Sequence, residues 1–140
     1  MDGLTSWFNY VVKNYDDILE AFWQHMQIVL VVIALATAFS VALGIIVQRN
    51  SSARAITLSI AGIFLTIPSL ALFAVFIPIL GIGNAPAMAA LFLYAILPIL
   101  RNTVTGLDEV SPAVVESARG MGMGSMQQLL RVKLPLAWPV

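Results

Sequence analysis

Two long stretches of the chain carry no charge. The first extends from Met26 to Gln48, and a helix of this length, at about 1.5 Å per residue, crosses a hydrocarbon layer of about 30 Å. The second covers residues 55–100, which is too long for one helix, and Gly81, Gly83 and Pro86 interrupt it. The pattern therefore predicts three transmembrane helices, at about residues 26–48, 55–80 and 87–100.

A more polar segment precedes the first predicted helix. Residues 1–25 contain four acidic residues and one basic residue, which is the wrong sign for a cleavable signal peptide. Within the segment, apolar and aromatic side chains recur at three- and four-residue steps, as on one face of a helix. These side chains are Trp7, Val11, Tyr15, Ile18 and Phe22. We expect residues 1–25 to form an external interfacial segment that lies along the bilayer surface.

Pro68 lies in the middle of the second predicted helix. Proline removes a helical hydrogen bond, and backbone groups in lipid have no water to replace it. A hydroxyl group or a water-lined cavity can supply the missing partner, which makes Thr66, Pro68 and Ser69 a candidate translocation path. A packing kink accounts for the proline equally well, because proline is common in membrane helices.

The sequence after the third predicted helix has the signals of two short helices. Ser111 followed by Pro112 is typical of a helix start, and this helix is predicted to end near Arg119. Three glycines then interrupt the chain, at Gly120, Gly122 and Gly124. Ser125 and Gln128 have the spacing of a capping box and predict a second start. The expected arrangement is a helix, a glycine hinge and another helix.

Composition agrees with a membrane protein. Hydrophobic residues make up 60% of the chain and charged residues 10%, so there is too little polar surface to cover a soluble domain of this size. The formal net charge is zero, which gives no general attraction to nucleic acid. Cysteine is absent and His25 is the single histidine, expected at the outer boundary of the bilayer. The sequence therefore predicts neither a catalytic set nor a metal site.

The basic residues predict the orientation of the chain. Six of the seven fall on one side of the predicted spans, at Arg49, Arg54, Arg101, Arg119, Arg131 and Lys133. By the positive-inside rule this side is cytoplasmic. We therefore expect a multi-pass protein with its N-terminus outside.

The glycine-rich stretch admits other interpretations. It does not fit a phosphate-binding loop, because it follows a helix rather than a strand and lacks the Lys-Ser/Thr pair. Its methionines, Met121, Met123 and Met126, would form an adaptable apolar surface. Contact with another protein and burial against the membrane helices of the chain are equally compatible with that surface.

The spacing in this segment resembles the cytoplasmic signature of binding-protein-dependent ABC importers. That signature reads Glu-Ala-Ala, three residues, Gly, nine residues, Ile, one residue, Leu-Pro. The chain keeps every interval with Glu116, Ser117, Ala118, Gly122, Val132, Leu134 and Pro135, and it departs at Ser117 and Val132, which replace Ala and Ile. Residues 66–71, 81–83, 97–103 and 120–123 are similar to the branch that imports glycine betaine, carnitine and choline.

The resemblance implies an all-α membrane protein, a multi-span helical bundle of the type I ABC importer permease kind. It implies a non-catalytic permease subunit for a small osmoprotectant such as a quaternary ammonium compound, in a bacterial inner membrane. Residues 101–135 would form the cytoplasmic coupling loop. The coupling residues implied are Glu116, Ser117, Ala118, Gly120, Met121, Gly122, Met123, Val132, Leu134 and Pro135.

The implied partners are a cytoplasmic ABC ATPase, a second permease subunit of the same or a homologous kind, an extracellular substrate-binding protein and the lipid bilayer. The chain itself would bind no cofactor, since the ATPase would use ATP and Mg²⁺. Residues 136–140 are expected to begin a further span, so the chain looks truncated at its C-terminus relative to such permeases. Three alternatives stay open: an ABC permease for another solute such as an amino acid, a membrane module that docks a cytoplasmic partner without transport, and a small self-associating channel.

Overall fold

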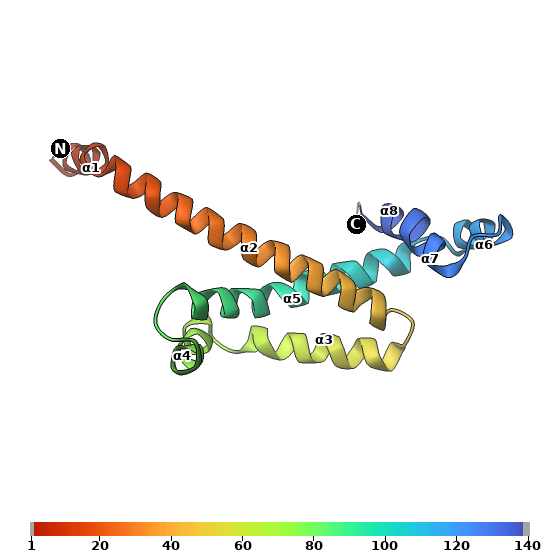
Figure 1. Cartoon of the computed structure of the whole chain (residues 1–140). Helices are drawn as coiled ribbons and strands as arrows, with labels where there is room; N and C mark the ends of the chain where they lie inside the picture. The colour runs from red at the N-terminus through yellow and green to blue at the C-terminus, as the bar shows by residue number, and fades with distance from the viewer. Residues whose placement is uncertain (1, 139–140) are drawn as a thin grey trace.

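The computed structural model describes residues 2–138, with the side chain of Asp2 left out, and these residues form a helical array (Figure 1). The helices are α1 (Asp2–Lys13), α2 (Tyr15–Val47), α3 (Ser51–Thr66), α4 (Ser69–Leu80), α5 (Asn84–Glu109), α6 (Pro112–Gly120), α7 (Ser125–Gln128), the π-helical turn η1 (Leu129–Lys133) and α8 (Leu134–Ala137). Within the described residues, α2 and α5 are each long and apolar enough to cross a membrane, and α3 with α4 makes a third span if the bent pair counts as one.

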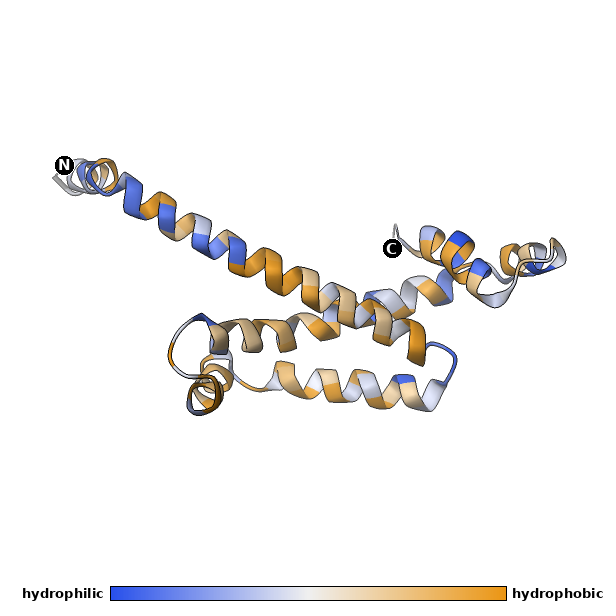
Figure 2. Cartoon of the chain, viewed as in Figure 1, coloured by the Kyte–Doolittle hydropathy of each residue, from blue (hydrophilic) through white to orange (hydrophobic). Residues whose placement is uncertain are grey.

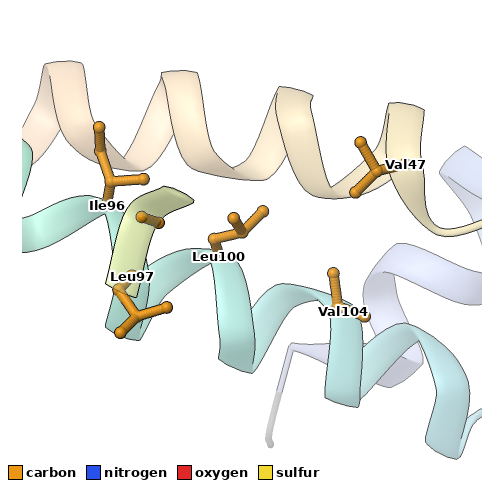
Figure 3. Packing of buried hydrophobic residues seen from close by; sticks show 6 residues of the cluster. Val47, Ile96, Leu97, Leu100 and Val104 are labelled. Carbon is orange, nitrogen blue, oxygen red and sulfur yellow. The ribbon is translucent and has the colours of Figure 1, made fainter. Parts of the chain in front are cut away.

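The packed centre of the array lies where α5 meets α2 and α3. Leu100 of α5 is fully buried, and a cluster of apolar side chains surrounds it (Figure 3). The cluster comprises Val47, Ala61, Ile96, Leu97, Leu100 and Val104. Much of the remaining apolar surface faces outward, including Ile46, which is 74% exposed. Such a surface requires lipid or protein around it, in agreement with a membrane protein.

Small residues bring α2 and α5 close together. Ala36, Ser40 and Gly44 recur every fourth residue along α2, and all three are buried. A Cβ atom at Gly44 would lie 2.8 Å from the Cγ2 atom of Thr103 on α5. The spacing of small residues therefore sets the distance between the two helices, as is common in membrane helix pairs.

The second predicted helix, residues 55–80, is broken in the structure. It consists of α3 and α4, which meet at an angle of 96° at Ile67 and Pro68. The missing N–H of Pro68 and its steric conflict with the preceding turn explain why α3 stops. The Tyr94 hydroxyl of α5 donates a hydrogen bond to the Ile67 carbonyl, so a neighbouring helix satisfies the backbone at the break. The expectation of one helix over 55–80 was wrong.

The N-terminal half of the chain also differs from the expected division at residue 25. Helix α1 ends at Lys13, and α2 then continues from Tyr15 through the predicted span to Val47 without a break. Figure 2 shows the polar residues of α2 gathered in its N-terminal part and the apolar residues beyond them. The repeat of Trp7, Val11 and Tyr15 thus crosses a turn and does not form one continuous helical face.

Helix α5 begins at Asn84 and extends to Glu109, beyond the predicted limits of 87–100. The first nine residues assigned to the loop 101–135 are therefore helical. The helix continues past Arg101 because a long charged side chain can extend its charged group into water from a helix that leaves the apolar layer. Of the predicted start of a further span at 136–140, residues 136 and 137 belong to α8, and residues 139 and 140 lie outside the described part of the chain.

Candidate functional site

Residues 111–135, which we call the hinged segment, fold as two helical limbs joined by a tight turn (Figure 1). The first limb, α6, begins as predicted, with Ser111 at the N-cap position and Pro112 as the first helical residue. The Ser111 carbonyl accepts hydrogen bonds from Val114 N and Val115 N at 3.1 and 3.3 Å. The predicted start is confirmed, although the Ser111 side chain makes no capping hydrogen bond.

The turn after α6 is a Schellman motif. Met123 N donates to the Ala118 carbonyl at 3.1 Å and Gly122 N donates to the Arg119 carbonyl at 3.0 Å, which is the pair of bonds that defines this helix end. Gly122 has a φ of +82°, while Gly120 and Gly124 have no positive φ. Only Gly122 therefore needs to be glycine for conformational reasons, and the expected flexible hinge is a specific hydrogen-bonded turn.

The second limb begins one residue earlier than the sequence predicted. Gly124 is the N-cap residue, and its N–H donates to Oε1 of Gln127 at 3.2 Å. Gln128, which was expected to complete the cap, instead donates from Nε2 to the Met123 carbonyl at 2.7 Å. Both glutamine side chains thus fasten the turn to the second limb.

A π-helical turn interrupts the second limb at the end of the signature. Leu134 N bonds to the Leu129 carbonyl, five residues earlier, and Pro135 follows directly. A proline ring would clash with the carbonyl of Arg131 in a regular α-helix. The π-helical turn directly before Pro135 widens the backbone there, and such bulges are frequent at functional sites.

Helix α8, which continues the second limb two residues beyond the hinged segment, returns to α5, so both ends of the segment are held to the same helix. A Cβ atom at Gly106 of α5 would lie 2.8 Å from the backbone oxygen of Ala137. Between the limbs, Ala118 of α6 is 2% exposed, and α6 contacts η1. The small residues Gly106 and Ala118 therefore allow the close packing that makes the segment a hairpin.

The outer surface of this hairpin presents one carboxylate and flexible apolar groups. Glu116 is exposed, and among the described residues its carboxylate forms no hydrogen bond or ion pair. Ser117 Oγ donates to the Ala113 carbonyl at 2.8 Å. Met121 and Met126 are 71% and 66% exposed, while Met123 is partly covered. The hairpin thus offers an unpaired negative charge beside two accessible methionines.

An ion pair that the sequence did not predict lies near the root of the hinged segment. Arg54, at the start of α3, contacts Asp108, in the last turn of α5. The two side chains are 33% and 53% exposed. The contact links the N-terminal end of α3 to the C-terminal end of α5, next to the start of the hinged segment. No pattern in the sequence relates residues 54 positions apart.

The candidate translocation residues lie at the opposite end of α3 from the Arg54–Asp108 contact. Thr66, Pro68 and Ser69 are all exposed at the α3–α4 break. Thr66 Oγ1 donates to the Ile63 carbonyl at 2.7 Å. Ser69 lines a cavity of about 240 Å³ together with Phe73 and Tyr94. The structure brings these residues near one another but not near the hinged segment.

The remaining candidate chemistry is sparse. No group of three or more His, Asp or Glu residues is placed to hold a metal ion within residues 2–138. His25 is an exposed residue of α2, in the polar N-terminal part of that helix. The candidate functional residues named above therefore lie in two places, the hinged segment and the α3–α4 break.

Comparisons with known proteins cover the part of the chain that contains both features. A family model described as the inner membrane component of binding-protein-dependent transport systems matches residues 36–140. The choline transport system permease protein OpuBB of Bacillus subtilis is 40% identical over 94% of this chain and 60% of its own length.

Two further relatives agree with this match. The carnitine transport permease protein OpuCB of Listeria monocytogenes is 39% identical over 96% of this chain and 61% of its own length. The osmoprotectant import permease protein OsmW of Salmonella typhimurium is 39% identical over 94% of this chain and 64% of its own length. The chain thus spans about three fifths of the length of the curated relatives it matches.

Proposed function

Since this chain belongs to the family of inner membrane components of binding-protein-dependent transport systems, we propose that it serves in the permease subunit of an ATP-driven osmoprotectant importer. In this proposal the hinged segment receives the movement of a cytoplasmic ATPase, and the membrane helices transmit it. The chain itself is non-catalytic, as this family is. The partner ATPase would bind and hydrolyse ATP with the help of Mg²⁺.

The observation that carries the proposal is the double attachment of the hinged segment to α5. A displacement of the hairpin acts on α5 at Val110 and, through Ala137, at Gly106. Helix α5 in turn contacts α2, α3 and α4. A force applied at the hairpin would therefore reach every membrane helix of the described chain, because close-packed interiors transmit strain.

The exposed surface of the hairpin suits a protein partner. Glu116 has no internal partner among residues 2–138, so it is available for a charge-assisted hydrogen bond to a basic group of the ATPase. Met121 and Met126 add apolar contact area that can adapt to a moving surface. The remaining coupling residues would shape the hairpin that presents these groups. They are Ser117, Ala118, Gly120, Gly122, Met123, Val132, Leu134 and Pro135.

The solute class follows from the relatives, whose names specify choline, carnitine and osmoprotectant transport. We infer a small quaternary ammonium compound rather than another solute such as an amino acid. The exposed residues Thr66, Pro68 and Ser69 at the α3–α4 break would lie along its path. An external binding protein would select the solute, and a second permease subunit would complete the pathway.

We infer that the hinged segment lies in the cytoplasm and the N-terminus outside. Arg54 and the hinged segment lie at the same end of the helical array, because Arg54 contacts Asp108 next to the segment. The basic residues around the start of α3 and within the hinged segment thus gather at one end, as the positive-inside rule expects of the cytoplasmic side.

Copurification with the ATPase tests the role of the hinged segment. Glu116→Lys should weaken copurification from membranes several-fold, since it replaces the proposed hydrogen-bond acceptor by a like charge. Glu109→Lys is the matched control, because Glu109 is an exposed carboxylate at the end of α5 and lies outside the signature. Equal retention of the ATPase by both variants would refute the proposed contact.

Uptake of radiolabelled choline or glycine betaine by the assembled importer separates transport from docking without transport. The proposal requires ATP-dependent uptake that is lost in Glu116→Lys. ATPase copurification without uptake of either solute would favour the docking module, and conductance without any ATPase would favour a channel.

A further inference from the structure

Helix α1 has an apolar face that the other residues described by the structure leave uncovered. Leu4, Trp7 and Phe8 lie on it and are 81%, 64% and 64% exposed. The opposite side carries Ser6 and Asn9, at spacings that separate the two sides of a helix. We propose that this face lies in the headgroup layer of the outer leaflet and anchors the N-terminal end of α2 to the bilayer surface.

The turn at Asn14 allows α1 to take a direction different from that of α2. Asn14 has φ −111° and ψ 27°, and its side-chain Nδ2 donates to the Tyr10 carbonyl at 2.7 Å. The same carbonyl accepts the backbone N–H of Asn14 at 3.0 Å, so two hydrogen bonds close the last turn of α1. Figure 1 shows α1 turned across the axis of α2. Helix α1 is thus a separate element that ends at the turn before α2.

The length of α2 determines whether α1 can reach the lipid. Its 33 residues correspond to about 50 Å at about 1.5 Å per residue. One hydrocarbon layer with one headgroup layer measures about 36–38 Å. A tilt of about 40°, at the upper end of the usual range, brings Tyr15 into the headgroup layer. Figure 1 shows α2 running obliquely to α3 and α5, which is the arrangement that this tilt needs.

The composition of α1 favours a lipid surface over a soluble partner. Trp7 and Tyr10 are residue types enriched at membrane interfaces, where an apolar ring and a polar group are both accommodated. The apolar face adjoins a helix that is long and apolar enough to cross the membrane. The acidic residues Asp16 and Asp17 stand at the start of α2. Attraction to anionic lipid therefore contributes little, and apolar burial drives the association.

Tryptophan fluorescence in lipid vesicles tests this proposal. The chain has three tryptophans, so Trp23→Phe with Trp138→Phe leaves Trp7 as the only reporter. The vesicles contain phosphatidylcholine and phosphatidylglycerol, with bromine placed on the acyl chain either near the ester linkage or near the methyl end. An apolar face seated about 5–10 Å deep predicts that bromine near the ester linkage reduces Trp7 fluorescence about twofold, and bromine near the methyl end far less.

A matched variant moves the reporter to the opposite side of the same helix. In Asn9→Trp with all three native tryptophans changed to Phe, brominated lipid should have little effect and aqueous iodide should quench strongly. Replacing phosphatidylglycerol by phosphatidylcholine should leave Trp7 quenching unchanged, since the association is apolar. A requirement for phosphatidylglycerol would contradict the proposed driving force.

Two results would overturn the proposal. Trp7 quenched by iodide and not by brominated lipid would place α1 in water. Trp7 shielded from both quenchers would mean that protein covers the face, either a second copy or an external partner. Circular dichroism of each variant verifies that the helices are retained. Because the measurement involves no ATPase or solute, its failure would leave the proposed transport function standing.

Discussion

Gly106→Ala should loosen the contact between α5 and α8, the helix that continues the second limb of the hinged segment. The added Cβ would lie 2.8 Å from the backbone oxygen of Ala137, and relief of that clash requires a movement of about 0.6 Å by one backbone against another. Overpacking of this kind costs about 1–3 kcal/mol. Removing a helical glycine returns up to about 1 kcal/mol, so the middle of that range, about 2 kcal/mol, leaves a net cost of about 1–2 kcal/mol.

Two other glycines provide a graded comparison. Gly62 lies within α3 with no atom within 4 Å of its added Cβ, so Gly62→Ala should be neutral or slightly stabilising. At Gly44 the nearest atom is the Thr103 methyl group, at 2.8 Å. A side chain can rotate away more easily than a backbone, and Gly44→Ala should therefore fall between the other two variants.

Cross-linking measures the local effect directly, because the chain lacks cysteine. Leu107 of α5 and Leu134 of the second limb line the same cavity of about 210 Å³, so a Leu107→Cys, Leu134→Cys pair reports their proximity. A docking equilibrium weakened by about 1–2 kcal/mol lowers the ratio of docked to undocked molecules about 5–30-fold, and cross-linking should slow in proportion to the docked fraction. Unchanged cross-linking in Gly106→Ala, with Gly62→Ala as the reference, would refute the docked arrangement.

Three further variants test separate contacts. Tyr94→Phe removes the hydrogen bond to the Ile67 carbonyl and should lower the stability of the helical array in detergent by about 0.6–1.7 kcal/mol, measured by thermal unfolding against Tyr10→Phe. Either Arg54→Asp or Asp108→Arg alone should lower stability by about 0.2–1 kcal/mol at low salt and by less at high salt. The double variant, which exchanges the two charges, should restore most of that loss. Gly122→Ala forces a left-handed backbone on an L-residue and should weaken ATPase copurification, whereas Gly120→Ala should not.

Local sequence signals predicted the parts of the fold that depend on neighbouring residues. The start of α6 at Ser111 and Pro112, the turn after it and the start of a further limb all follow from short-range rules of capping and glycine conformation. The long apolar stretches likewise predicted helices that can cross a membrane. Even there the cap of the second limb shifted to Gly124, because Gln127 rather than Gln128 reaches its backbone N–H.

Contacts between distant residues were beyond the reach of these rules. The ion pair of Arg54 with Asp108 and the packing of Gly106 against Ala137 depend on how the helices are arranged in space. Pro68 signalled an irregularity, but the 96° bend depends also on the Tyr94 hydrogen bond from another helix. The end of α1 was not predicted because the helical spacing of apolar residues continues past Asn14, whereas the helix itself is interrupted there.

The central claim is that the hinged segment stands on the cytoplasmic face of the membrane. Arg119→Cys and Ser6→Cys each introduce a single thiol into a cysteine-free chain, at exposed positions on the segment and on α1. A membrane-impermeant maleimide applied to intact cells should label Cys at position 6 and not at position 119, and inverted vesicles should give the reverse. Labelling of position 119 from outside intact cells would contradict the account, because no cytoplasmic ATPase could then reach the segment.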